Sequence, residues 1–245
     1  MKKVILAAAI MAAAMPAMAQ EDFAPEAGDI SLELQFNPFS DNFETFKMER
    51  LQGTYMFSEK DGLRFGLGLD LHNNKVTPSE LNEDANTKNS YGSFSINLGY
   101  ERHFYNYKRI DLYAGVEAVY THRWAKQTIN SEVGSGVTDP YTGNEIMIIS
   151  TDEKFNYATD KDGKAFRGGN DFRFNLFTGI NFSVYKGLYV GAELGLGLGF
   201  EHDSWQYDKI NTPGVPEVET TKGNKGNSFD LEFYATPALR LGWTF

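Results

Sequence analysis

The chain has 245 residues with 23 Lys and Arg against 33 Asp and Glu, a formal net charge of −10, and no cysteine. The acidic balance argues against a nucleic-acid partner, which needs clustered basic residues, and a mean hydropathy of −0.42 excludes a bundle of membrane-spanning helices. The missing cysteines exclude disulfides, thiolate metal sites, cysteine nucleophiles and a lipid-modified N-terminal cysteine.

The N-terminus has the pattern of an export signal. Two lysines precede a run of 12 apolar residues, and a proline ends that run. Ala17 and Ala19 then supply the small-x-small pattern that a signal peptidase reads. We predict a signal peptide over residues 1–19, cleavage between Ala19 and Gln20, and a short periplasmic segment over residues 20–29.

The rest of the chain alternates between apolar and polar residues, as β-strands do when their side chains point to opposite faces. The alternating segments, in chain order, are 30–36, 50–57, 63–71, 94–101, 110–121, 172–184, 188–201 and 229–245. In each, one face carries bulky apolar side chains and the other carries glycine, small polar or charged residues. The pattern predicts eight strands.

The connections between these segments alternate between short and long. Short turns are expected at 58–62, 106–109 and 186–187, and long connections at 37–47, 73–90, 126–170 and 206–228. Outer-membrane barrels combine short periplasmic turns with long external loops in this way, whereas a soluble sandwich has no reason to do so. The sequence therefore predicts an all-β fold over residues 30–245: an eight-stranded antiparallel up-and-down transmembrane β-barrel with periplasmic termini. An external hairpin is expected within the third long connection, at 145–150 and 155–157, and the strand count becomes ten if that hairpin enters the membrane.

The apolar face is predicted to point outward, toward lipid. The polar face is rich in small residues, which suits the narrow interior of an eight-stranded barrel. Outward aromatic residues collect near both ends of the strands, as interfacial girdles do. The periplasmic set is Tyr55, Phe57, Tyr100, Phe104, Trp243 and Phe245, and the external set is Phe36, Tyr120, Trp124, Phe172, Phe200 and Phe229.

The chain resembles the small outer-membrane β-barrels of the OmpA-like and OmpX-like kind. Asn37-Pro38-Phe39 and the glycine-rich segment 63–71 are similar to barrel proteins of Bacteroidota. The last strand resembles the C-terminal signal that the barrel assembly machinery reads, through Leu239, Leu241, Trp243 and Phe245. The resemblance implies a location in a Gram-negative outer membrane.

Charged residues on the inward face predict an ion-pair network in the lumen, formed by Glu33, Arg50, Arg64, Asp70, Glu117, Glu193 and Arg240. Counted from the periplasmic end, the residues at one height are Glu33, Glu193 and Arg240, and those of a higher group are Arg50, Asp70 and Glu117. The favoured interpretation is a plug, because interior charges are costly unless paired. The alternative is an ion gate that opens when a pair breaks.

No constellation in the sequence predicts catalysis, a cofactor or a metal. His72 and His103 are expected in the lumen, and His122 and His202 on the outer face near the external rim, where no recognisable triad forms. The acidic stretch 160–163 lacks the ligand spacing of a calcium loop.

The expected function is a structural and surface-interaction role through four external loops. The expected partners are outer-membrane lipids and lipopolysaccharide, the barrel assembly machinery during biogenesis, and an unidentified loop ligand. The alternatives are a small ion or solute channel and, from a third class, a lipid-modifying barrel enzyme.

Overall fold

The computed structural model describes residues 24–36, 50–77, 85–160, 163–221, 227–234 and 239–245. The predicted signal peptide with its cleavage residues Ala17, Ala19 and Gln20 lies outside these ranges, as does Asn37-Pro38-Phe39. Within the described part, no helix has the length and apolar composition needed to cross a membrane.

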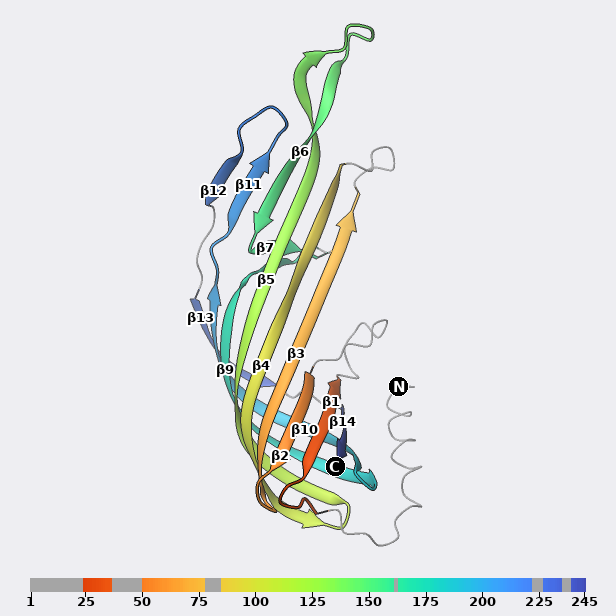
Figure 1. Cartoon of the computed structure of the whole chain (residues 1–245). Coiled ribbons are helices and arrows are strands. Elements are labelled where there is room, and N and C mark those ends of the chain that lie inside the picture. The colour runs from red at the N-terminus through yellow and green to blue at the C-terminus, as the bar shows by residue number, and fades with distance from the viewer. Residues whose placement is uncertain (1–23, 37–49, 78–84, 161–162, 222–226, 235–238) are drawn as a thin grey trace.

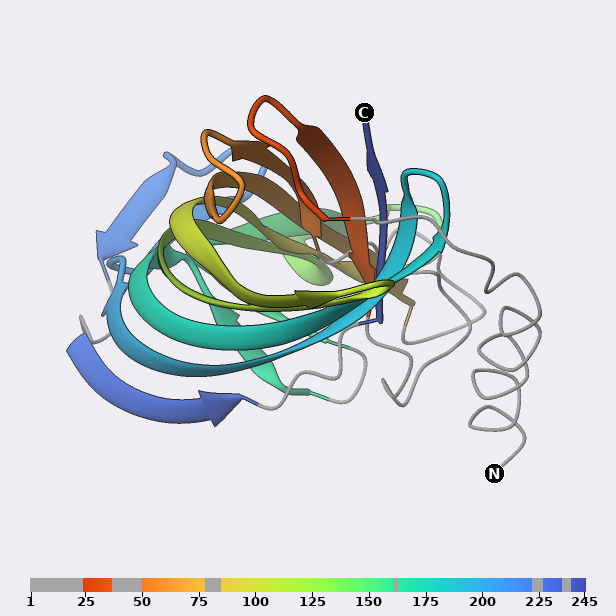
Figure 2. The same ribbon diagram turned by 90° about the horizontal axis from the view of Figure 1, so that it is seen from below.

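Eight strand positions form a closed antiparallel ring (Figures 1 and 2). The first seven are β1 (Ile30–Phe36), β2 (Arg50–Met56), β3 (Asp61–Val76), β4 (Asn86–Tyr107), β5 (Ile110–Thr138), β9 (Gly169–Tyr185) and β10 (Leu188–Asp203). The eighth consists of β13 (Asn227–Tyr234) and β14 (Leu239–Thr244), which pair with the same edge of β10. Pairing of β14 with β1 closes the ring, so the predicted eight-stranded barrel is confirmed.

The short connections gather at the end of the barrel where the C-terminus lies (Figure 1). β2 ends at Met56 and β3 begins at Asp61, and only two residues separate β4 from β5 and β9 from β10. The predicted short turns are therefore present at this end, which we call the periplasmic end.

At the opposite, external end the wall continues well above the ring (Figure 1). β5 runs on to Thr138 and pairs there with β6 (Glu145–Phe155), which pairs in turn with β11 (Tyr207–Asn211), and β11 pairs with β12 (Val218–Thr221). β5 pairs with β9 over residues 110–123 and with β6 from Lys126 onward. The hairpin of β5 and β6 thus lies above the ring, and the ten-stranded alternative is wrong.

Much of what the sequence analysis assigned to long connections is strand. β3 extends to Val76, β4 begins at Asn86, and β5 has 29 residues. The expectation of connections over 73–90 and 126–170 is wrong for these parts. Above the membrane both faces of a strand meet water or polar loops, so the apolar-polar alternation that identifies a half-buried strand disappears.

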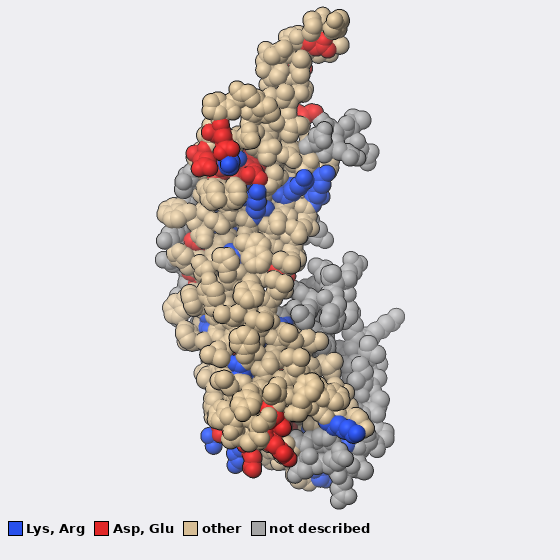
Figure 3. All heavy atoms as spheres, in the orientation of Figure 1, with Lys and Arg blue, Asp and Glu red and all other residues tan. Residues whose placement is uncertain are grey.

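The two faces of the ring have opposite chemistry, and the apolar one points outward. Leu176 and Leu63 are 58% and 48% exposed, whereas the inward Arg64 and Glu33 are 0% and 1% exposed. On the face that Figure 3 shows, charged residues are sparse in the middle of the molecule and gather above and below it. A surface of this kind fits lipid, since soluble proteins rarely expose large contiguous apolar patches.

Candidate functional site

The lower part of the lumen is organised around Arg240 of β14. Its Nε donates to Glu33 Oε1 at 3.1 Å, its Nη2 donates to the other oxygen of the same carboxylate, and its Nη1 lies 3.4 Å from Glu193 Oε2. Arg240 is 2% exposed. The closure of the ring, which sets β14 between β1 and β10, therefore places one guanidinium between two carboxylates from neighbouring strands.

Arg64 of β3 crosses the lumen to Glu193, one of these two carboxylates. Its Nη1 donates to Glu193 Oε2 at 3.0 Å, its Nη2 donates to Gln52 Oε1 at 3.0 Å, and its Nε lies 3.5 Å from Glu101 Oε2. The guanidinium also stacks 4.0 Å from the centre of the Phe177 ring. These contacts join β2, β3, β4, β9 and β10 across the interior, so Arg64 and Arg240 together form a charged layer that spans the barrel.

Neutral donors add further hydrogen bonds to the two carboxylates Glu33 and Glu193. Glu33 accepts from Gln35 at 2.9 Å, Gln52 at 2.7 Å and Tyr189 at 2.9 Å, and Glu193 accepts from Tyr113 at 3.0 Å. A buried ion pair is tolerated when additional hydrogen bonds satisfy the remaining lone pairs. The layer meets that condition for both carboxylates.

Inward glycines make room for the aromatic rings of this layer. A Cβ at Gly179 would overlap the phenol of Tyr113, and a Cβ at Gly242 would overlap the ring of Tyr189. Each tyrosine therefore lies flat over the backbone of a neighbouring strand. In this position its hydroxyl reaches a carboxylate at the centre of the lumen.

A second pair lies nearer the external end. Arg50 Nη1 donates to both oxygens of Glu117, at 3.1 and 3.0 Å, and the same carboxylate accepts from Asn97 at 3.1 Å and Asn175 at 2.8 Å. The predicted third member, Asp70, lies at a different height in the ladder. Asp70 pairs with Ser93 of β4, which pairs in turn with Arg123 of β5. It lies about 20 Å further along β3 than Arg64, and its carboxylate is 2.9 Å from His72 Nε2.

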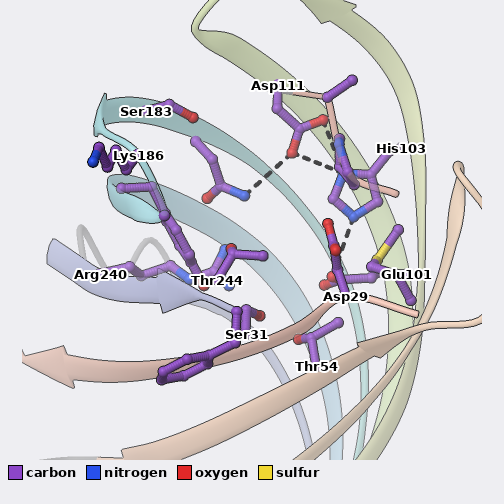
Figure 4. A pocket seen from close by; sticks show the side chains of 17 residues that line it. Asp29, Ser31, Thr54, Glu101, His103, Asp111, Ser183, Lys186, Arg240 and Thr244 are labelled. Atoms are coloured by element: carbon purple, nitrogen blue, oxygen red, sulfur yellow. Dashed lines mark hydrogen bonds and ion pairs between the residues drawn. The ribbon is translucent and has the colours of Figure 1, made fainter. Parts of the chain in front are cut away.

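The periplasmic end holds a third cluster, around a cavity of about 250 Å³ (Figure 4). His103 lies between two carboxylates, with Nδ1 2.7 Å from Asp111 and Nε2 3.2 Å from Glu101. Asp111 also accepts from Asn181 at 3.3 Å. Lys186 and Arg240 line the same cavity, as Figure 4 shows.

Another cavity, of about 590 Å³, lies on the external side of the charged layer, and Arg50 and Asn175 are among the residues that line it. Arg240 lines the periplasmic cavity instead. No residue lines both cavities. The side chains of the charged layer thus lie between two separate spaces.

A small hairpin of β7 (Tyr157–Thr159) and β8 (Ala165–Arg167) lies against the inner face of the external wall. Phe166 stacks on Tyr91 with 4.0 Å between ring centres, and the backbone N–H of Thr159 donates to Asn89 Oδ1 at 3.2 Å. A cavity of about 570 Å³ lies beside this hairpin, lined among others by Asp70, Tyr91 and Phe166. The hairpin therefore narrows the external mouth.

Several other residues singled out from the sequence lie on the outer surface. In the last strand, which begins at Leu239, the side chains of Leu241, Trp243 and Phe245 are 40%, 41% and 75% exposed. His122 lies on the outer face, where its Nδ1 is 2.9 Å from Asn170 Oδ1. Within the described residues, no group of three or more His, Asp or Glu is arranged to hold a metal ion.

Sequence reasoning missed several members of the interior network. Glu101 and Asp111 share the inward parity with Glu117 and are buried like it, and they lie beside His103, which the sequence did place in the lumen. The alternation itself was the signal that could have found them. Tyr113, Phe177 and Tyr189 were harder to find, because bulky aromatic residues were expected on the outward face.

Comparison with protein-family models matches residues 5–145 to a family described as outer membrane protein beta-barrel domain. This range covers more than half of the 245 residues. A comparison with curated proteins finds no match.

Proposed function

The chain belongs to the family of outer membrane protein β-barrel domains, and on this premise we propose that its lumen is plugged and that its role is structural and surface-interactive. The barrel anchors its external loops and extended strands in the outer membrane of a Gram-negative cell. The external segments, held on a rigid wall, supply any specificity, as loops on rigid scaffolds commonly do.

The observation that carries the plugged lumen is the charged layer of Arg64, Arg240, Glu33 and Glu193. Its members are nine-tenths or more buried, and they contact side chains of four further strands, β2, β4, β5 and β9. The two cavities on either side of it share no lining residue. Opening a path for ions would require breaking buried ion pairs, and each break leaves an uncompensated charge at a cost of about 3–5 kcal/mol. Such a cost supports a closed state as the resting state.

A surface-interaction role is supported by the strands that rise above the ring on the external side. β3, β4 and β5 extend beyond the ring, and β6, β11 and β12 add further strands that rise above it (Figure 1). We propose that this extension presents an unidentified ligand-binding surface. Outer-membrane lipids and lipopolysaccharide are the proposed partners of the outer face below it.

The proposal assigns no catalysis to the chain. On the lipid-facing side of the external rim it is supported by the environment of His122, whose ring nitrogen meets an amide oxygen of Asn170 rather than a carboxylate. A general base of the serine-histidine type needs a carboxylate to orient it. If the gene is deleted, the mass spectrum of lipid A from the cells should therefore stay unchanged, and a changed lipid A mass would favour a lipid-modifying enzyme.

Export and assembly complete the proposal. We propose that the signal peptide is cleaved after Ala19 and that the barrel assembly machinery reads the outward residues of the last strand. An N-terminal mass that starts at Gln20 in protein purified from the outer membrane would support the cleavage, and any other start would contradict it.

Single-channel recording tests the plugged lumen. The mature chain, residues 20–245, is refolded into a planar bilayer, with folding checked by its heat-dependent mobility in a gel. We expect silence from the folded protein and conductance from Arg64→Ala/Arg240→Ala, which removes both guanidinium groups from the layer. Steady conductance from the unmodified protein would overturn the plug and favour the channel.

A further inference from the structure

A group of three lysines lies on the outer surface directly above the apolar band. Each of these lysines lies on the outward face of its strand. Lys75 of β3 is on the same face as Leu71, Lys88 of β4 on the same face as Phe94, and Lys126 of β5 on the same face as Trp124. Figure 3 shows Lys and Arg side chains, with Asp and Glu side chains beside them, above the middle region where charges are sparse. We call Lys75, Lys88 and Lys126 the lysine surface.

Two of these lysines lie where the repulsion between their charges disfavours folding. Lys75 and Lys88 are direct cross-strand partners in the antiparallel ladder, and both are exposed. Like charges at directly opposed positions destabilise a sheet. Within the described residues neither lysine has a carboxylate, hydrogen-bond or aromatic partner, so nothing there offsets their repulsion.

Lys126, the third member of the lysine surface, and Lys209 of β11 both have partners. Lys126 Nζ lies 2.6 Å from Glu153 and 4.8 Å from the centre of the Phe155 ring. Lys209 Nζ lies 2.8 Å from Glu217, and this hydrogen bond raises the pKa of the lysine. Charge pairing is thus available in this part of a chain that carries an excess of acidic residues, which makes the open pair at Lys75 and Lys88 informative.

The surroundings of the lysine surface suit a polar anionic group. A hollow of about 430 Å³ is lined by all three lysines, and the residues of the same outward parity that line it are Asn73, Ser90 and Thr128. Asn, Ser and Thr provide neutral donors beside the positive charges. Phosphate oxygens accept hydrogen bonds from both kinds of group.

The height of the lysine surface fits the headgroup layer. Trp124 is two residues below Lys126 on the same outward face, and tryptophan marks the membrane–water interface. Lys75 lies four residues beyond Leu71, about 13 Å along a strand that is tilted from the barrel axis. The ammonium groups therefore lie just above the hydrocarbon, where the phosphates of the outer-leaflet lipid are.

We propose that the lysine surface binds the phosphate groups of lipid A, the phosphorylated anchor of outer-leaflet lipopolysaccharide. This inference rests on the proposed function, since it requires the barrel to lie in the outer membrane with this end outward. Bound phosphate neutralises the repulsion between Lys75 and Lys88. The protein thereby selects phosphorylated lipid for the part of the surrounding lipid shell that contacts β3, β4 and β5.

Binding of defined lipids tests the proposal. The refolded mature chain is placed in phosphatidylcholine nanodiscs and titrated with bisphosphorylated or enzymatically dephosphorylated lipid A, and bound lipid is counted by native mass spectrometry. The test variant is Lys75→Gln/Lys88→Gln. The matched control, Lys60→Gln/Lys108→Asn, removes the same charge from periplasmic turns, and asparagine suits the positive φ of 56° at Lys108.

We expect the unmodified protein and the control to bind bisphosphorylated lipid A alike. The test variant should bind it about thirtyfold more weakly, because each lysine near an anionic surface contributes about a factor of five. Equal binding of the test variant and the control would overturn the proposal, as would equal binding of dephosphorylated lipid A by the unmodified protein.

Folding is scored separately through the heat-dependent gel mobility. Failure of the unmodified chain to fold in the bilayer would overturn the barrel function, whereas a folded barrel that ignores the phosphates would overturn the lysine surface alone. In nanodiscs without phosphorylated lipid A, the test variant should resist urea at least as well as the unmodified protein, because its substitution removes a repulsion. A clear loss of stability there would show that the lysines serve folding, against the proposal.

Discussion

Replacing Arg240 by methionine tests whether the charged layer holds the barrel together. Methionine keeps much of the side-chain length and removes the charge from a position that is 2% exposed. Glu33 would lose two hydrogen bonds and Glu193 an ion pair at 3.4 Å. Removing one partner of a buried pair typically costs about 3–5 kcal/mol.

The expected cost lies at the lower end of that range, because both carboxylates keep other donors. Glu33 keeps Gln35, Gln52 and Tyr189, and Glu193 keeps Arg64 and Tyr113. We expect Arg240→Met to lower the free energy of unfolding by about 3 kcal/mol. Adding Glu33→Gln removes the stranded charge and should recover about half of that loss.

Urea unfolding of the refolded chain in lipid vesicles, followed by tryptophan fluorescence, measures these differences. The double variant and the single variant Glu33→Gln complete a mutant cycle, which isolates the coupling between the two side chains. A loss of less than about 0.5 kcal/mol for Arg240→Met would refute the reasoning, since surface changes away from buried networks are of that size. An additive cycle would show that the two groups do not stabilise each other.

Three further predictions concern the faces of the wall and its assembly. Leu196→Arg, at an outward position between Leu194 and Leu198, should destabilise the barrel in vesicles by about 2–4 kcal/mol, with Leu196→Met as the neutral control; an unchanged unfolding midpoint would defeat the outward assignment. Deletion of Phe245, which is 75% exposed, should lower the amount of barrel in outer-membrane fractions, and normal levels would remove this residue from the assembly signal. Gly179→Val should cost about 1–3 kcal/mol by displacing the Tyr113 phenol from Glu193, and an unfolding free energy equal to that of the unmodified chain would mean that the ring moves aside freely.

The sequence by itself determined the architecture of the ring. Each strand in the membrane has lipid on one side and a narrow polar lumen on the other. Segments such as 63–71 and 188–201 therefore alternate between bulky apolar residues and small or polar ones. The short turns at 108–109 and 186–187 then set the order of neighbours. Consecutive strands are neighbours in an up-and-down barrel, and closure sets the last strand beside the first, so the position of Arg240 between Glu33 and Glu193 followed from the topology and the heights of these residues along their strands.

The tertiary structure decided which interior side chains meet across the lumen. Arg64 reaches Glu193 on the far side of the ring, and Asp70 lies beyond Glu117 rather than beside it. Strand tilt and side-chain length control these contacts, and neither can be read from parity. The extension formed by β5, β6, β11 and β12 was also beyond sequence reasoning, because a strand that meets water on both faces shows no alternation. The lysine surface lies on the upper parts of β3, β4 and β5: only the register that pairs Lys75 with Lys88 brings two separate positive charges together above the membrane.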